Sequence, residues 1–261
     1  MNRMSKPFLS VVIPSYNEMA NLQKGVLDKL EHYLSKQKYT WEAIIVDDGS
    51  DDGSIEFVET FIKDNPHLSL IKNNHTGKAG AVTKGVLKAS GDIILFTDMD
   101  QATPIEEVEN VLPYFEKDLP AGRQGFDVVI GSRSSKRKNA PLTRLVMARS
   151  MMILRTIIVG VSGISDTQCG FKAFRHDVAK KLFQKISTIN NGFSEISGSK
   201  VSAGFDVELL YLAQKMKFKI KEVPISWLYV ETRRVSPIKD SMDGFIDLIK
   251  IKLNSIKGIY N

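Results

Sequence analysis

Cysteine and histidine are scarce in this sequence. The single cysteine among the 261 residues is Cys169, so no disulfide can form within the chain, and a reducing compartment is expected. The four histidines lie far from Cys169 and from one another, at spacings unlike those of zinc ligands. These shortages exclude a disulfide-stabilised fold and disfavour a zinc site.

Long apolar stretches are also missing. A membrane-spanning helix needs about 18 or more apolar residues in a row, and the best candidate, residues 151–164, has Arg155 inside it. Residues 1–7 contain no apolar segment, so we expect no signal peptide. Since 43% of the residues are hydrophobic, the chain can still bury the core of a globular protein.

Glycine is missing where a Rossmann dehydrogenase requires it. The turn after the first expected strand, residues 14–18, reads Pro-Ser-Tyr-Asn-Glu, which disfavours dinucleotide binding of that type. No P-loop sequence occurs either. Gly-Lys-Ala-Gly at 77–80 opens an expected helix, where backbone N–H groups and Lys78 are suited to hold phosphate, although such a stretch is more often a plain turn.

Positive charge is in excess. Lys and Arg outnumber Asp and Glu by 36 to 30, which gives a net charge of +6 and a pI near 9.2. This balance favours anionic partners. Nucleotide phosphates, anionic lipid headgroups and nucleic acid all meet that description, and composition does not choose among them.

Short apolar stretches alternate with helical patterns over the first half of the chain. The expected strands are 8–13, 41–46, 68–71, 93–97 and 126–130, and the expected helices are 17–35 with Asn17 as its N-cap, 54–63, 77–89 and one beginning at Pro104. This alternation predicts an α/β fold with a parallel sheet and helices on both faces.

The pattern changes after Arg133. We expect a helix at 141–159, a strand at 170–174, a helix to about 185, a surface loop at 187–202, a helix at 205–217, a strand at 219–227 and a final helix at 240–257. No repeat or low-complexity tract divides the chain, so we expect a single domain over residues 1–261.

Two carboxylates, Asp98 and Asp100, end the apolar run 93–97. Side chains at i and i+2 of an extended chain point the same way, here past the carboxyl end of a strand, where open α/β sheets bind ligands. Two oxygen ligands beside an open site suit Mg²⁺ or Mn²⁺, which complete their coordination with substrate phosphates. Taken alone, such a pair at a strand end is more often a turn.

Polar side chains follow the ends of four expected strands, and these ends share one edge of a parallel sheet. They are Tyr16 and Glu18, Asp47 and Asp48, Asp98 and Asp100, and Arg133. A nucleoside diphosphate lying along that edge would find ring and carboxylate partners, a bridging metal and an arginine. Each pair alone is more often structural, but four on one edge favour a nucleotide site.

Eight motifs, in the same order, carry a resemblance to a known family. They are VVIPSYNE (11–18), IIVDDGSDDGS (44–54), GKAGAV (77–82), GDIILFTDMD (91–100), VVIGSR (128–133), DTQCGFKAF (166–174), GFDVELL (204–210) and EVPISW (222–227). On these residues the sequence resembles the inverting family 2 glycosyltransferases with the GT-A fold, in the branch that transfers sugar to polyprenyl (dolichyl-type) phosphate. DTQCGFKAF and FDVELL resemble the glucosyltransferases more than the mannosyltransferases, which implies UDP-glucose as donor, with GDP-mannose as the alternative.

The resemblance implies roles for individual residues. Donor contacts fall on Pro14, Tyr16, Glu18, Val46, Asp48, Asp98, Met99, Asp100, Arg133 and Arg234, and the acceptor phosphate falls to Arg144 and Arg149. To these we add Lys78 on the donor side, from its place at a helix start, and Asp166 on the acceptor side. Asp98 and Asp100 would hold Mg²⁺ or Mn²⁺ and act in catalysis with Arg133. Arg234 stands where the family has a lysine, and Ala148 where the mannosyltransferases have a serine. Residues 1–133 become the nucleotide-sugar half and 134–261 the acceptor half.

A lipid phosphate is already ionised near neutral pH, because the second pKa of a phosphate monoester is about 6. A strong general base is then unnecessary. Asp166 or Asp206 would be the candidate base if the acceptor were a sugar hydroxyl, although capping a loop (Asp166) or a helix (Asp206) explains either residue as well or better.

The acceptor implies contact with a membrane surface. Basic and apolar residues mix in 136–159, as in helices that lie at an interface. The last helix has an apolar stripe of residues at 3–4 spacing, namely Phe245, Leu248, Ile249, Leu253 and Ile256. Any core-facing helix shows such a stripe, so we expect this helix to pack on the sheet. We expect a cytoplasmic protein that is peripheral at the cytoplasmic face of a membrane. A separate membrane protein is a possible partner.

Two other classes of function compete with this interpretation. One is a family 2 transferase that acts on a sugar hydroxyl of a glycan. The other is a non-catalytic basic protein that binds membrane or nucleic acid. Asp98 and Asp100 argue against the second class, and the basic run at 136–138 lacks the interleaved aromatic residues that nucleic-acid binding favours.

Overall fold

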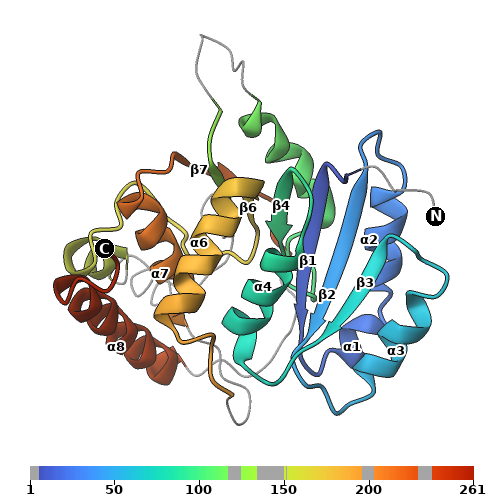
Figure 1. Ribbon diagram of the computed structural model, residues 1–261, viewed down its shortest axis with the longest axis horizontal. Helices are drawn as coiled ribbons and strands as arrows, with labels where there is room; N and C mark the ends of the chain where they lie inside the picture. Colours follow the sequence, from blue (N-terminus) through green and yellow to red (C-terminus); the bar gives the residue numbers. More distant parts are fainter. Residues whose placement is uncertain (1–5, 117–124, 134–149, 151, 196–202, 229–236) are drawn as a thin grey trace.

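A seven-stranded sheet forms the centre of the protein in a computed structural model, which describes residues 6–116, 125–133, 150, 152–195, 203–228 and 237–261 (Figure 1). The strands are β1 (Leu9–Ser15), β2 (Trp41–Asp47), β3 (Leu68–Lys72), β4 (Ile93–Phe96), β5 (Val128–Ser132), β6 (Lys172–Arg175) and β7 (Ile220–Pro224). Their order in the sheet is β3-β2-β1-β4-β6-β5-β7, and every strand except β6 runs parallel to the others. The predicted α/β class with a mostly parallel sheet is confirmed.

Helices cover both faces of this sheet. They are α1 (Met19–Leu22), α2 (Val26–Leu34), α3 (Ser54–Phe61), α4 (Gly77–Lys88), the 3₁₀ helices η1 (Ile105–Asn110) and η2 (Leu112–Phe115), α6 (His176–Ile189), α7 (Ala203–Lys215) and α8 (Pro237–Ile256), with residues 152–158 also helical. Helices α4, α6, α7 and α8 contribute to the core on one face, and α1, α2, α3, η1 and η2 to the core on the other.

The two cores follow from the period-two geometry of the strands. In β1, Val12 belongs to the core beneath α4 and α6, whereas its neighbours Val11 and Ile13 belong to the core on the opposite face. Successive side chains of a strand point to opposite faces, so an unbroken apolar run fits a strand that is buried on both sides. All three side chains are at most 1% exposed.

Two expected helices are wrong in detail. The segment 17–35 forms two helices, because Gly25 at φ +73° breaks it, and Asn17 at φ +54° lies outside the helix that it was expected to cap. A left-handed residue cannot continue a right-handed helix. The segment after Pro104 forms two short 3₁₀ helices, and the second of these begins where Pro113 interrupts helical hydrogen bonding.

Strand β6 is the antiparallel member of this mostly parallel sheet. It lies between β4 and β5 and runs opposite to both. Its first residue, Lys172, is therefore at the edge where β4 and β5 end. Residues 166–171, which lead into β6, are brought to the same edge as Asp98 and Arg133.

Helix α4 lies so close to the sheet that a side chain at Gly85 would collide with it. A Cβ on Gly85 would lie 2.4 Å from Val12 Cγ1 and 2.8 Å from Val46 Cγ2. We expect Gly85→Ala to lower the free energy of unfolding by up to about 2 kcal/mol, because overpacking costs about 1–3 kcal/mol and the better helix propensity of alanine returns about 1 kcal/mol.

Denaturant unfolding measures this loss, with Lys88→Ala on the exposed side of α4 as the control. In the Gly85→Ala background, Val12→Ala should cost less than it does in the wild type, because it removes the colliding methyl groups. Equal costs in the two backgrounds would contradict the proposed collision.

Candidate active site

The carboxyl ends of four parallel strands bring the expected site residues to one edge. Tyr16 follows β1, Asp48 follows β2, Asp98 lies two residues beyond β4, and Arg133 follows β5. Because β1, β2, β4 and β5 all run in the same direction, these residues share the edge that the sequence predicted.

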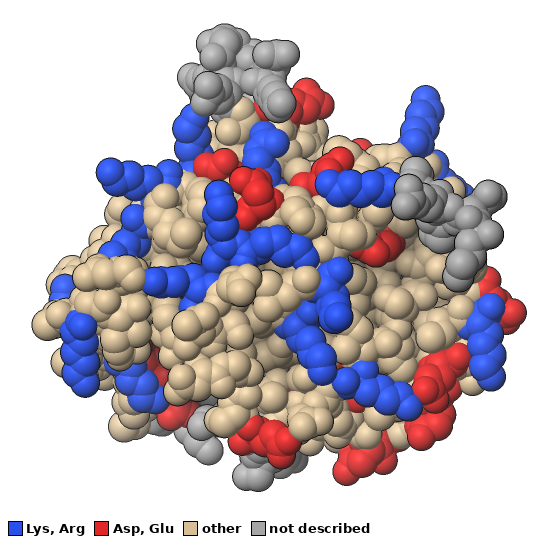
Figure 2. All heavy atoms as spheres, viewed as in Figure 1, with Lys and Arg blue, Asp and Glu red and all other residues tan. Residues whose placement is uncertain are grey.

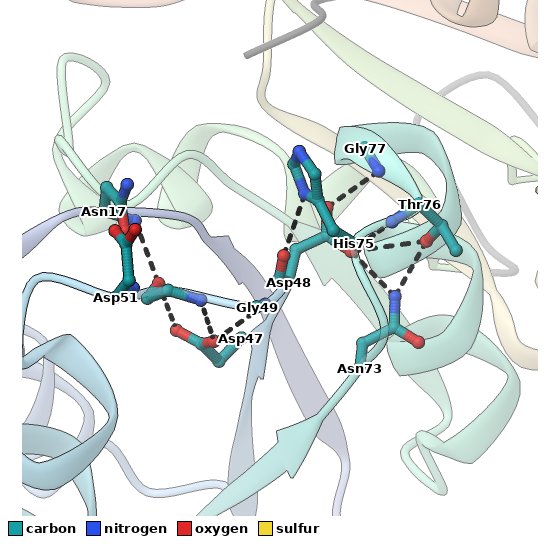
Figure 3. A network of polar contacts seen from close by, with 10 residues as sticks. Asn17, Asp47, Asp48, Gly49, Asp51, Asn73, His75, Thr76 and Gly77 are labelled. Carbon is teal, nitrogen blue, oxygen red and sulfur yellow. Dashed lines mark hydrogen bonds and ion pairs between the residues drawn. The ribbon is translucent and has the colours of Figure 1, made fainter. Parts of the chain in front are cut away.

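Asp48 joins the end of β2 to the start of α4 (Figure 3). Its Oδ1 accepts hydrogen bonds from Thr76 N at 3.0 Å and Asn73 Nδ2 at 2.8 Å, and its Oδ2 accepts one from Gly77 N at 2.7 Å. His75 Nδ1 lies 2.9 Å from the same Oδ2. The buried carboxylate thus satisfies free N–H groups at the helix start.

The neighbouring acid, Asp47, folds its own turn. Its Oδ1 accepts hydrogen bonds from Gly49 N at 3.0 Å and Ser50 N at 2.9 Å, and its Oδ2 accepts one from the Ser50 hydroxyl at 2.6 Å. Asn17 Oδ1 accepts one from Asp51 N at 3.0 Å, as Figure 3 shows. Asp47 and Asp48 therefore both have a structural role in this fold.

Tyr16 stacks on His75. Their ring centroids are 4.2 Å apart, with 15° between the ring planes. Since His75 also contacts Asp48, the three side chains form one ordered wall at the ends of β1 and β2. Nothing in the sequence pointed to His75, because its position depends on the turn between β3 and α4.

The other residues expected to contact the donor differ in how far they can reach a ligand. Val46 and Met99 are buried in the two cores, so any ligand contact of theirs would have to run through the backbone. Pro14 is half-buried in β1. Glu18 Oε2 accepts a hydrogen bond from Asn21 Nδ2 at 2.6 Å.

Lys78 and Asp98 form an ion pair between the start of α4 and the end of β4. Lys78 Nζ lies 2.5 Å from Asp98 Oδ1, and the Asp98 side chain is 41% exposed. Burial opposes the charged form of Lys78, but the charges of Asp98 and Asp206 outweigh it and raise the pKa of Lys78. The lysine therefore stays a cation beside the two acids of the Asp-Met-Asp turn.

Gly170 leaves room for the Asp98 carboxylate. A Cβ on Gly170 would lie 2.0 Å from Asp98 Oδ2 and 2.6 Å from its Cγ. This close approach depends on the antiparallel entry of the chain into β6, and it explains why glycine stands at this point of the segment 166–171.

Asp100 is the more enclosed of the two acids. Its Oδ1 accepts a hydrogen bond from Ala102 N at 3.0 Å. Burial, and then the nearby charge of Asp98, raise the pKa of Asp100. Two carboxylates that repel each other in this way gain from a shared cation, so the pair fits Mg²⁺ or Mn²⁺. In the described residues no group of three His, Cys, Asp or Glu side chains is placed to hold a metal.

Arg133 is held by Asp166 through a two-pronged ion pair. Arg133 Nε lies 2.7 Å from Oδ2 and Nη2 lies 2.8 Å from Oδ1, and the backbone N of Arg133 also donates to Oδ2 at 3.0 Å. Burial opposes ionisation of Asp166, but Arg133 outweighs it and lowers the pKa of Asp166. An acid whose two oxygens are both engaged is poorly suited to act as a general base.

Asp206 pairs with a fully buried lysine, and its expected role as the cap of a helix start is wrong. It lies in the first turn of α7, and Lys172 Nζ is 2.5 Å from its Oδ1 and 2.5 Å from the carbonyl oxygen of Cys169. No role was predicted for Lys172. A lysine inside the apolar strand pattern Gly-Phe-Lys-Ala-Phe was the signal from which a buried acidic partner could have been inferred.

Several expected acceptor contacts lie outside the described residues. They are Arg144, Arg149 and Arg234, together with Ala148 and the basic run 136–138. The described site therefore comprises the donor side and the region of Asp98, Asp100, Arg133 and Asp166.

Residues 10–183, more than half of the chain, match the sequence pattern of the family described as glycosyl transferase family 2. The chain belongs to glycosyl transferase family 2. It is thus an enzyme of the glycosyltransferase class, and the predicted resemblance to this family is confirmed.

Similarity to members of the family extends along nearly the whole chain. The chain is 30% identical over 275 residues to the dolichyl-phosphate beta-glucosyltransferase of Dictyostelium discoideum, covering 99% of this chain and 78% of that protein. It is 33% identical to the dolichyl-phosphate beta-glucosyltransferase of Saccharomyces cerevisiae, covering 97% of this chain and 76% of that protein.

A solved structure supports the fold of the family 2 chain. Glucosyl-3-phosphoglycerate synthase from Mycobacterium tuberculosis, crystallised with Mn²⁺, uridine diphosphate and glucosyl-3-phosphoglycerate, matches with a TM-score of 0.58 and 17% identity. The match covers 94% of this chain and 80% of that one. At this identity the likeness shows the fold alone.

The cap at the start of α4 predicts a large structural effect of Asp48. We expect Asp48→Ala to lower the free energy of unfolding by about 3 kcal/mol or more, because each hydrogen bond to a buried charge is worth about 1.5–3 kcal/mol. Denaturant unfolding measures it, with Asp51→Ala, an exposed acid three residues on, as the matched control. A variant as stable as the control would show that the carboxylate does not hold α4.

Proposed function

We propose that this family 2 enzyme transfers glucose from UDP-glucose to a polyprenyl phosphate of the dolichyl type. The observation that carries the proposal is the cluster of two carboxylates, Asp98 and Asp100, with Lys78 beside them at the carboxyl edge of the sheet. The full-length similarity to two proteins named dolichyl-phosphate beta-glucosyltransferase supports the acceptor and the sugar.

Asp98 and Asp100 would hold Mg²⁺ or Mn²⁺ in this reaction. A bound divalent ion supplies charge neutralisation for the diphosphate as the bond to the sugar breaks. Within the chain, Lys78 is fixed 2.5 Å from Asp98 and supplies a second positive charge at the same place. Arg133 is held in one orientation by Asp166, so it meets the donor phosphates without losing much conformational freedom.

The donor half, residues 1–133, would bind the nucleotide along the ends of β1 and β2. The wall of Tyr16, His75 and Asp48 offers ring surface and polar atoms there. The backbone of Val46 and Met99, with Pro14 and Glu18, completes the proposed contacts. The choice of UDP-glucose over GDP-mannose rests on the resemblance of the motifs at 166–174 and 205–210.

The ion pair between Asp166 and Arg133 agrees with a phosphate group as the acceptor. A phosphate oxygen is ionised near neutral pH and attacks without a strong base, whereas a sugar hydroxyl needs one. Asp166 is bound to Arg133 on both oxygens and Asp206 to Lys172, so neither acid is free to take a proton. The acceptor half, 134–261, would orient the lipid phosphate with Arg144, Arg149 and Arg234.

The described residues contain no helix that is both long and apolar enough to span a bilayer. We propose that the enzyme meets its lipid acceptor as a peripheral protein at the cytoplasmic face of a membrane, alone or with a separate membrane partner.

A radiolabelled-donor assay tests the proposed reaction. With UDP-glucose, Mn²⁺ or Mg²⁺ and dolichyl or undecaprenyl phosphate, we expect label in the organic phase, lost when a chelator is added. We expect Asp100→Ala to lower turnover about 100-fold or more, because such losses follow removal of transition-state charge stabilisation, and Glu106→Ala, an exposed acid in η1, to leave it unchanged. Label that appears only on sugar acceptors, or with GDP-mannose alone, would refute the proposal.

Gly170 provides a second, finer test. We expect Gly170→Ala to lower kcat/KM at least about tenfold, because its Cβ displaces Asp98, and displacements near 1 Å can cost about 100-fold. The melting temperature should change little, since Asp98 is partly exposed. In an Asp98→Ala background the substitution should have no further effect on turnover, and an additive loss would mean that Gly170 acts elsewhere.

A further inference from the structure

The apolar stripe of α8 faces outward, contrary to the expectation that it packs on the sheet. Leu248 is buried as expected, but Phe245, Ile249, Leu253 and Ile256 are between 39% and 71% exposed. With Met242 and Ile246, α8 supplies six of the twelve large hydrophobic side chains that are exposed in the described part of the chain. We call these six residues the outer stripe.

The outer stripe lies opposite the face that joins α8 to the protein. At 3.6 residues per turn the six side chains fall within an arc of about 100° and along about 21 Å of helix. The buried residues Gly244, Leu248 and Ile251 lie on the other side. The stripe is therefore the wide apolar face of an amphipathic helix turned away from its own core.

Polar contacts fix this orientation. Gly204 N donates to Asp247 Oδ2 at 3.0 Å, and the hydroxyls of Tyr211 and Ser255 lie 2.5 Å apart, so α7 holds α8 at two levels. A Cβ on Gly204 would lie 2.7 Å from Asp247 Cβ, which shows how closely the helices approach. Rotating α8 to bury its stripe would break both contacts.

Lysines border the outer stripe on both sides. At 100° per residue, Lys250 and Lys257 fall on one flank and Lys252 on the other, all exposed, and Asp243 shares the first flank. Figure 2 shows uncharged surface and Lys or Arg side chains at the lower left, where Figure 1 places α8. The helical segment 152–158, yellow-green in Figure 1, lies on the same side of the molecule in that view, and its Ile153 and Ile157 are exposed.

We propose that α8 lies flat in the headgroup region of an anionic lipid bilayer, with the outer stripe toward the acyl chains and the flanking lysines on the phosphates. The inference rests on the proposed function for the identity of the acceptor and supplies the surface by which the enzyme reaches it. An apolar face with exposed lysines on both flanks matches the profile of an anionic bilayer, which is apolar inside and negative at its surface.

The location of α8 supports this occupant. Gly204, which binds Asp247 of α8, is two residues from Asp206, whose carboxylate pairs with Lys172 at the sheet edge where β4 ends. The bilayer and the catalytic edge are thus connected by the first turn of α7. Two copies of the chain packed stripe to stripe would instead bring the flanking lysines of both copies close together, which disfavours self-association.

Vesicle co-sedimentation of the full chain tests the proposal. The probes are phosphatidylcholine vesicles and vesicles of equal parts phosphatidylcholine and phosphatidylserine. We expect wild-type protein to bind the mixed vesicles in a salt-dependent manner. Ile249→Glu/Leu253→Glu should weaken binding about tenfold or more, because two apolar side chains leave the interface. The control Lys63→Glu, in an exposed position after α3, changes the net charge by the same two units and should bind as the wild type does.

A second variant separates the electrostatic contribution to vesicle binding from the apolar one. Lys250→Gln/Lys252→Gln/Lys257→Gln should lose the preference for anionic vesicles while its circular dichroism and melting temperature stay those of the wild type. The proposal is overturned if wild-type protein ignores both vesicles or if the glutamate variant binds as well as wild type. It is also overturned if the stripe proves to be covered by a second copy, seen as a dimer that the glutamate variant loses.

Turnover distinguishes failure of this inference from failure of the proposed function. With a short, water-soluble polyprenyl phosphate, the glutamate variant should transfer glucose as fast as wild type, while losing activity toward dolichyl phosphate in vesicles. Vesicle binding without any glucose transfer would leave the membrane surface standing and refute the proposed reaction. Equal losses with both acceptors would show that α8 acts on the site itself and not through a membrane.

Discussion

The capping of α4 by Asp48 is the contact on which the candidate site depends. The carboxylate binds backbone N–H groups of Thr76 and Gly77 and so sets where the helix begins. The next residue, Lys78, is thereby placed against Asp98 at the end of β4. Asp48 at the end of β2 thus determines that the positive charge of Lys78 lies beside Asp98, two strands away in the sheet.

Ion pairs arrange the site in two layers. Lys78 with Asp98 and Arg133 with Asp166 lie at the edge, while Lys172 with Asp206 lies beneath them, fully buried. Removing either partner of a buried pair leaves an uncompensated charge, which is far more costly than removing both. The layers therefore hold the cationic groups in position before any phosphate arrives, which reduces the reorganisation that the reaction requires.

The sequence predicted the features that depend on local spacing. Asp98 and Asp100 are two residues apart, and other polar residues follow the ends of strands. This spacing predicted that the side chains share one edge of the sheet, and in the structure they do. The sequence did not predict the direction of β6, because a short strand pattern such as Gly-Phe-Lys-Ala-Phe fits a strand running either way. Nor did it show that Gly25 breaks a helix, since an isolated glycine is tolerated in many helices.

Ambiguity of a different kind affected Asp48 and α8. A carboxylate at a strand end can bind a ligand or cap a helix, and the choice rests on Thr76 and Gly77, which are distant in sequence. A helical stripe has the same period whether it faces a core or a membrane. Only the contacts of the opposite face, here Asp247 with Gly204 and Ser255 with Tyr211, decide which side is buried.

The same contacts explain why a chain in which no described helix can span a bilayer is suited to a lipid acceptor. A lipid phosphate remains at the membrane surface, so the enzyme must present its catalytic edge there while the nucleotide arrives from water. Helix α7 links the two regions, because its first turn contacts α8 through Gly204 and, through Asp206, the buried Lys172 at the start of β6. Binding energy gained by α8 at the surface is thereby available to orient the site relative to the lipid phosphate, which is the positioning that a reaction between two anions most requires.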